Sequence, residues 1–99
     1  MNESSIIKPS LVPGAVDQKF FELLIEISSL RSEKVIAALQ DYFVYGKNRA
    51  RISIQRNVNQ GYLSLKIREL QNLNNKLFII SNYMLACESK NKNSTTNFS

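Results

Sequence analysis

Residues 47–68 read KNRARISIQRNVNQGYLSLKIR, and this stretch carries the strongest structural signal in the chain. It predicts a short helix over residues 49–56, a tight turn, and a second helix that begins at about Gln60. A short strand is the alternative for the first element, because residues 52–54 alternate apolar and polar side chains. The order helix, turn, helix is typical of DNA-binding helix-turn-helix proteins.

The turn at residues 57–59 has local signals of its own. Asn57 tolerates a positive φ, and Val58 is expected to be a buried plug between the two helices. Asn59 is a good N-cap for the helix that follows. The apolar residues predicted to face the core from this second helix are Leu63, Ile67 and Leu70.

The same stretch is strongly basic, with six Lys and Arg residues and no acidic residue. The formal net charge of the whole chain is +5, so the rest of the chain is slightly acidic. Local positive charge of this kind is typical of a surface that binds an anion such as nucleic acid. The alternative is the solvated face of a small basic protein.

Residues of the second helix that point away from its buried face are candidate base readers. Gln60 suits an adenine edge, Leu65 a thymine methyl group, and Arg68 a guanine or a phosphate. Basic residues on the first helix and the turn are expected to bind phosphates. Core packing is the alternative for Tyr62, and an oligomer contact for Leu65. The candidate DNA-binding residues are Lys47, Arg49, Arg51, Arg56, Asn59, Gln60, Gly61, Tyr62, Ser64, Leu65, Lys66 and Arg68.

Two more helices are predicted upstream of this stretch, capped by Asp17 and Ser32, and Gly46 is expected to end the second. The first is apolar around most of its circumference, so one of its faces is expected to be a subunit interface. Residues 1–16 are predicted to form an arm, in which Leu11 and Val12 pack back on the domain.

The apolar rhythm of the second motif helix continues to about Leu85. Either one long helix or two helices separated near residues 72–75 would satisfy it, and the spacing suits a partner helix as well as a core. Residues 17–85 thus form the predicted DNA-binding and oligomerisation domain, and residues 86–99 a disordered polar tail. The predicted oligomer interface is Phe20, Phe21, Leu24, Ile25, Leu77, Ile80 and Met84.

Composition limits both the fold and the chemistry. A chain of 99 residues predicts one small all-α domain of four to five helices. With no His and a single Cys, it is expected to be no enzyme and to hold no metal and no cofactor. Glu22 and Glu26 lie one helical turn apart, which is more typical of an exposed stripe than of a catalytic pair. A cytoplasmic location is expected, because neither a signal peptide nor a membrane span is evident.

Several of these stretches resemble the PapB family of adhesin-biosynthesis transcription regulators. They are residues 11–14, 20–29, 35–42, Gly46, and residues 59–64 with Arg68 and Leu70. The resemblance implies a small regulator, encoded with a fimbrial operon, that binds AT-rich duplex DNA on the bacterial nucleoid as a homodimer or larger oligomer. The family's DNA-binding segment carries over onto Arg49, Arg51, Asn59, Gln60, Gly61, Tyr62, Ser64 and Arg68.

Some family members are described as minor-groove binders, whereas a helix-turn-helix favours the major groove, and both remain open at this point. Two other functions also compete with a DNA-binding regulator. The first is a helical protein-protein interaction module whose basic face docks an acidic partner. The second is RNA binding, for which Tyr62 is the exposed aromatic candidate.

Overall fold

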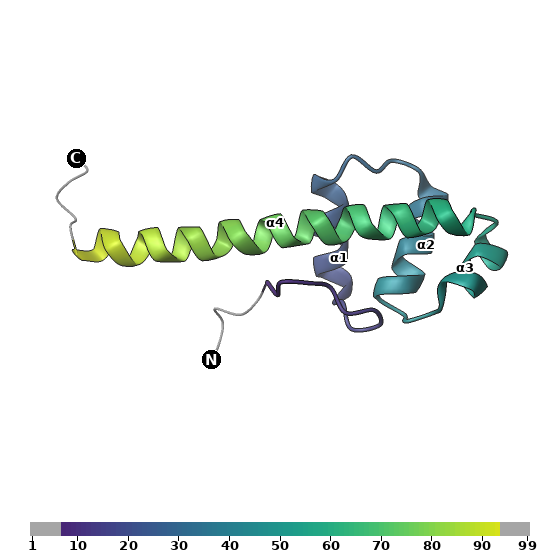
Figure 1. The fold of residues 1–99 in the computed structure, drawn as a ribbon, viewed down its shortest axis with the longest axis horizontal. Helices are drawn as coiled ribbons and strands as arrows, with labels where there is room; N and C mark the ends of the chain where they lie inside the picture. Colours follow the sequence, from purple (N-terminus) through teal and green to yellow (C-terminus); the bar gives the residue numbers. More distant parts are fainter. Residues whose placement is uncertain (1–6, 94–99) are drawn as a thin grey trace.

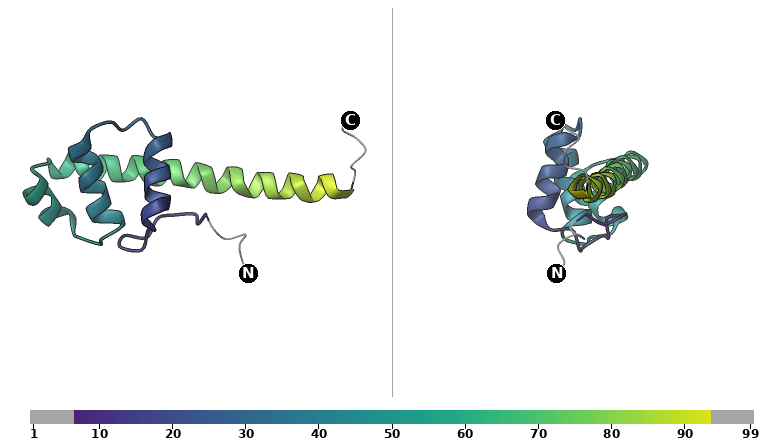
Figure 2. Two further views of the ribbon diagram at one scale, coloured as in Figure 1. Left: turned by 180° about the vertical axis from the view of Figure 1, so that it is seen from behind. Right: turned by 90° about the vertical axis from the view of Figure 1, so that its left-hand side faces the viewer.

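The computed structural model describes residues 7–93, and all regular secondary structure in that range is helical (Figure 1). The helices are α1 (Gln18–Ile27), α2 (Glu33–Phe43), α3 (Arg49–Arg56) and α4 (Gln60–Asn93). Helices α1 to α3 gather along the first half of α4, and the rest of α4 projects away from them as a rod (Figure 2). The predicted all-α fold with a helix-turn-helix is confirmed.

Side-chain caps set where the helices begin. At the start of α1, for example, the Asp17 carboxylate accepts a hydrogen bond from the Phe20 backbone N–H at 3.1 Å. Such a cap satisfies one of the backbone donors that the first turn of a helix leaves without a partner. The four capping residues are Asp17, Ser32, Asn48 and Asn59. The predicted helix starts are therefore confirmed.

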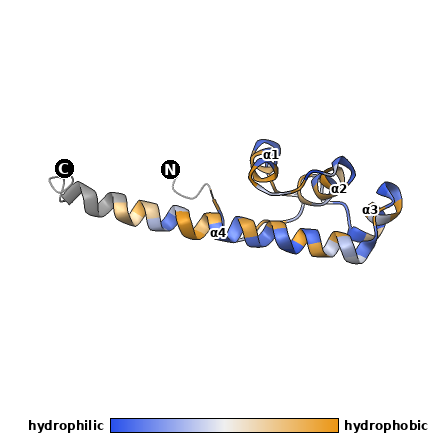
Figure 3. Ribbon diagram, turned by 90° about the horizontal axis from the view of Figure 1, so that it is seen from above, coloured by the Kyte–Doolittle hydropathy of each residue, from blue (hydrophilic) through white to orange (hydrophobic). Residues whose placement is uncertain are grey.

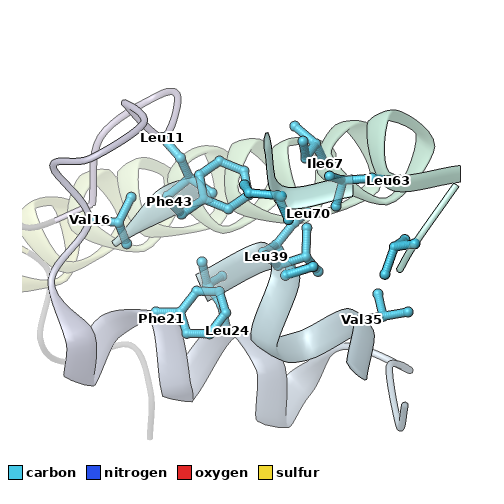
Figure 4. Packing of buried hydrophobic residues seen from close by; sticks show 13 residues of the cluster. Leu11, Val16, Phe21, Leu24, Val35, Leu39, Phe43, Leu63, Ile67 and Leu70 are labelled. Carbon is cyan, nitrogen blue, oxygen red and sulfur yellow. The ribbon is translucent and has the colours of Figure 1, made fainter. Parts of the chain in front are cut away.

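One hydrophobic core lies between the four helices and the chain segment that precedes α1 (Figure 4). Each fully buried Leu, Ile, Val or Phe side chain contributes about 1.5 to 3 kcal/mol to folding. The largest fully buried apolar side chains are Phe21, Leu24, Leu39, Phe43, Ile52, Leu63 and Leu70. Residues 49–56 form the helix α3, which packs on this core through the completely buried Ile52, so the strand alternative for this segment is wrong.

The segment before α1 packs on the core as predicted, but with a different residue pair. Leu11 and Val16 are buried, whereas Val12 is 58% exposed. The Leu11 N–H donates to Gln71 Oε1 and the Gln71 amide donates to Leu11 O, both at 2.8 Å. The expectation for Val12 was wrong because the chain turns there, with Ala15 N–H donating to Val12 O. Residues 1–6 of the predicted arm lie outside the described range.

Gly14 and Gly46 allow this segment to approach the end of α2. Both have positive φ angles, 80° and 73°, and a Cβ atom on Gly14 would lie 3.1 Å from the Gly46 Cα. The Gly14 N–H donates to Phe43 O at 2.9 Å. Helix α2 already ends at Phe43 with Val44 as its C-cap, so the prediction that Gly46 ends this helix was wrong. Close backbone contact explains the glycine instead.

Helix α4 is continuous, which excludes a break near residues 72–75. It also runs to Asn93, beyond the predicted end at Leu85, so the backbone of residues 86–93 is helical and that part of the predicted disordered tail was wrong. Residues 94–99 of that tail lie outside the described range. None of the helices in residues 7–93 has the length and hydropathy needed to cross a membrane.

Two residues of the predicted oligomer interface are buried inside the chain itself. Phe21 is 2% exposed and Leu24 is 1% exposed, so neither side chain is available to a second subunit. The prediction for these two was wrong because α2 and α4 together cover the inner face of α1. Leu23 and Ile27 are the apolar side chains that α1 leaves exposed.

Candidate nucleic-acid interface

The turn between α3 and α4 has the geometry that the sequence predicts. Asn57 adopts the left-handed conformation with φ 57° and ψ 51°, and Val58 is buried. The Asn59 side chain accepts a hydrogen bond from the Tyr62 N–H at 2.9 Å and so caps α4. Since all three turn residues act as expected, the predicted helix-turn-helix is present.

Side chains from two helices brace this turn. The Ser53 hydroxyl donates to Val58 O at 2.6 Å, and the Lys34 ammonium group donates to Asn57 O at 3.0 Å. Lys34 belongs to the first turn of α2, so its contact ties the turn to another helix. This contact could not be predicted from local sequence patterns, because residues 34 and 57 are far apart along the chain.

The start of α4 presents a mixed polar and apolar surface. Gln60 and Arg68 are exposed, as are Tyr62 at 45% and Leu65 at 44%. Core packing, the alternative for Tyr62, is therefore excluded. Ser64 is half-buried.

Gly61 lies in the first turn of α4, beside the helix cap. A Cβ atom at this position would lie 3.2 Å from Asn59 Oδ1. A larger residue at position 61 would therefore crowd the cap, which is a structural reason for glycine in addition to the predicted close approach to DNA.

The Lys66 side chain contacts two other side chains on its own helix. Its ammonium nitrogen lies 3.1 Å from Glu69 Oε1 and 5.2 Å from the centre of the Tyr62 ring. The hydrogen bond to Glu69 raises the pKa of Lys66. The lysine therefore packs along the helix surface beside the Tyr62 ring.

The other basic residues of the motif flank the start of α4. Arg49 and Arg51 are exposed on α3, and the Arg49 guanidinium carbon lies 5.9 Å from the centre of the Tyr42 ring. We define the basic face as Lys47, Arg49, Arg51 and Arg68, all of which are exposed.

Arg56 differs from these residues because a buried carboxylate holds it. Asp41 of α2 is only 3% exposed, and it accepts hydrogen bonds from Arg56 Nε at 2.8 Å and from Arg56 Nη2 at 3.2 Å. These bonds lower the pKa of Asp41 and raise the pKa of Arg56. Lys47 Nζ is farther away, at 3.7 Å from Asp41 Oδ1. Sequence reasoning missed Asp41, although it lies one helical turn after the buried Ala38.

A second surface lies on the projecting half of α4. We define the distal segment as residues 76–87, where apolar positions extend along the rod (Figure 3). Of the predicted interface residues here, Ile80 and Met84 are exposed and Leu77 is half-buried against the core. The predicted α1 residues Phe20 and Ile25 are also half-buried against the core. The exposed large apolar residues of the distal segment are Ile79, Ile80, Tyr83, Met84 and Leu85.

The family model for PapB, described as adhesin biosynthesis transcription regulatory protein, matches residues 1–84. The chain is 57% identical over 77 residues to the regulatory protein FanB of Escherichia coli, covering 78% of both chains. It is 41% identical over 64 residues to the pilus operon regulatory protein PapB of Escherichia coli, covering 65% of this chain and 62% of that protein. The crystal structure of Escherichia coli FocB is similar, with a TM-score of 0.70 and 34% identity, over 77% of this chain and 86% of FocB.

Proposed function

Because this chain belongs to the PapB family of adhesin biosynthesis transcription regulatory proteins, we propose that it binds AT-rich duplex DNA as an oligomer through α3 and α4. The family consists of regulators of adhesin operons, not enzymes, as the composition of the chain predicts. A transcription regulator role follows from this membership. Binding to AT-rich DNA in the cytoplasm, on the nucleoid, is the finer proposal.

The observation that supports DNA binding most strongly is the exposed start of α4 with basic residues around it. Gln60, Leu65 and Arg68 are exposed in the first turns of α4, whose position is fixed by a braced turn. In a helix-turn-helix, these are the positions that meet base edges in the major groove. Lys47, Arg49 and Arg51 then bind the phosphates that flank the groove.

Preference for A·T pairs has two physical routes in this chain. Leu65 offers an apolar contact to a thymine methyl group, which G·C pairs lack. Arg49 and Arg51 carry charges that suit the narrow minor groove of A·T tracts. The first route supports major-groove docking of α4, and the second supports the minor-groove alternative.

Self-association is proposed to use the distal segment of α4 in place of α1. Leu73, Leu77, Ile80 and Met84 repeat at steps of four, three and four residues, which is the spacing of a two-helix seam. The first two pack against the core, and the seam continues from them along the exposed rod. A second copy of the chain would cover it.

Titration of two labelled duplexes of equal length, one AT-rich and one GC-rich, at two salt concentrations tests this proposal. The protein should bind both with strong salt dependence and bind the AT-rich duplex more tightly. Arg49→Gln should weaken binding to both, whereas the matched control Arg31→Gln, an exposed arginine between α1 and α2, should not.

A folded protein that binds neither duplex at low salt would overturn the proposal. The basic face would then fit the acidic surface of a protein partner, which was the competing function. Competition by unrelated duplex DNA separates the two functions, because DNA would not displace an acidic protein partner from an interaction module.

A further inference from the structure

We infer that Asp41 is a positioning residue that holds Arg56 away from the DNA phosphates and so limits the positive charge of the basic face. The inference rests on the proposed function and concerns how that same surface is built. It changes the sequence-based role of Arg56 from a DNA contact to a brace.

Burial of the carboxylate is the first reason. Asp41 and Asn74 are the buried polar side chains among the residues that the structure describes, and Asp41 is the charged one. A buried carboxylate needs a charged, hydrogen-bonded partner, because removing that partner leaves an uncompensated charge. Arg56 supplies two hydrogen bonds, from Nε and Nη2, one to each carboxylate oxygen.

Competition with DNA is the second reason. Two N–H groups of the Arg56 guanidinium are held by Asp41, whose side chain is only 4% exposed, so a phosphate that drew Arg56 away would leave a desolvated carboxylate without its nearest partner. Lys47 is the weaker partner of this carboxylate, since its ammonium nitrogen lies 3.7 Å from Asp41 Oδ1, whereas Arg56 Nε lies 2.8 Å from Asp41 Oδ2. Arg56 therefore stays on Asp41 when DNA binds, whereas Lys47 remains available.

The position of Arg56 in the chain determines what the Arg56–Asp41 pair holds in place. Arg56 is the last residue of α3, directly before Asn57, and Asp41 lies near the end of α2. The pair thus fixes the point where the chain enters the turn that aims α4. The Lys34 contact to Asn57 O ties the next residue to the start of the same helix. Both ends of α2 hold the turn in place.

The salt dependence of DNA binding distinguishes a brace from a phosphate contact, because each phosphate contact contributes about 0.9 to the slope of log K against log salt. Wild type, Arg56→Gln and Arg49→Gln are titrated against the AT-rich and the GC-rich duplex. Arg49→Gln should lower the slope by about 0.9. Arg56→Gln should leave the slope unchanged and narrow the affinity ratio between the two duplexes.

Asp41→Asn gives the complementary result. Removal of the carboxylate charge releases Arg56 toward DNA, so the slope should rise by about 0.9 and binding to the GC-rich duplex should become tighter. A purely structural role for Asp41 would lower stability without raising the slope. Arg56→Lys keeps a charge beside Asp41 and should retain the wild-type slope under either reading, so the slope of Asp41→Asn decides the inference if Arg56→Gln does not fold.

A slope that falls in Arg56→Gln as it does in Arg49→Gln would show that Arg56 contacts phosphate and would overturn the inference alone. An unchanged slope in Asp41→Asn would also overturn it. Failure of the wild-type protein to bind either duplex would overturn the proposed function itself, and the two failures are thereby distinguishable.

Discussion

Single residues at the α3–α4 turn combine an unfavourable local feature with a contact that compensates for it. Asn57 adopts a left-handed backbone that most residues avoid, and Asp41 places a carboxylate in the core. Neighbours offset both costs, since Lys34 binds the Asn57 carbonyl and Arg56 binds the Asp41 carboxylate. The direction in which a substitution at these positions changes the stability of the protein can therefore be predicted.

Asn57→Ala should destabilise the protein by about 1 to 2 kcal/mol, because alanine pays the full cost of the left-handed conformation. Urea unfolding monitored by circular dichroism measures the change. Asn57→Gly is the matched control, since glycine adopts positive φ without steric cost. Equal losses in the two variants would mean that the Asn57 side chain, and not its backbone angle, stabilises the turn.

Because of Asp41, the free energy of unfolding should depend on pH in the acid range. Arg56 holds the pKa of the Asp41 carboxyl below its ordinary value of 3.8 in the folded protein. The unfolded chain then binds the proton more readily, so this stabilisation is complete above about pH 4 and is lost as pH falls through the lower, folded-state pKa.

The unfolding free energies of wild type and Asp41→Asn, measured from neutral pH to about pH 2, test the direction of this pH dependence. The variant should be less stable at neutral pH, and the two curves should converge in acid. A constant difference across that range would show that the carboxylate charge does not supply the stabilisation.

Helices α3 and α4 differ greatly in length, but both depend on the core. Helix α3 spans eight residues, too few to be stable alone, and it depends on the buried Ile52 and on the Asn48 cap. Helix α4 spans 34 residues, and its first half is held by the core. The contact between the segment before α1 and the end of α2 depends instead on two glycines, Gly14 and Gly46.

Gly14→Ala should destabilise the protein by more than about 2 kcal/mol, because a positive φ and a backbone contact at 3.1 Å both oppose a Cβ atom. Thermal unfolding measures the loss. Gly61→Ala is the comparison and should lose less stability, since Gly61 has no positive φ and its added Cβ would crowd only the Asn59 side chain, at 3.2 Å, and no backbone atom. A similar loss in both variants would contradict the role given to the Gly14–Gly46 contact.

The molecule as a whole is a compact head with a rod, with principal dimensions of 58 × 27 × 19 Å. The head holds the basic face, and the rod exposes apolar side chains that no part of the described chain covers. An exposed apolar stripe of this kind marks an interaction site in a folded protein. The two surfaces lie on one continuous helix, so association along the rod would fix the heads relative to each other.

Ile80→Glu should reduce the oligomer to monomer without unfolding the head, because Ile80 is half exposed on the rod and contributes nothing to the core. DNA affinity should fall by about 100-fold or more through loss of multivalent binding. Sedimentation measures the mass, and the duplex titration measures the affinity.

Asn82→Glu is the matched control for this change, since Asn82 is exposed near the opposite side of the same helix and lies outside the proposed seam. An Ile80→Glu protein with unchanged mass would mean that the distal segment is not the interface between copies.

Local features of this fold could be predicted from the sequence. Capping by Asp17, Ser32 and Asn59 operates within three or four residues of the cap, so the pattern alone locates it. The same holds for the left-handed Asn57 and for the apolar rhythm that buries Leu63, because both follow from the geometry of one helix and one turn. The candidate readers on α4 were identified in the same way.

Features that join distant parts of the chain depended on tertiary packing. Arg56 meets Asp41 across 15 residues, and Gln71 meets Leu11 across 60. The sequence could not show which face of α1 is covered, since Phe21 and Leu23 are equally apolar, and the positions of α2 and α4 bury the first while leaving the second exposed. Periodicity identifies apolar faces and local caps, but the partner of each face or charge is determined only when the helices pack together.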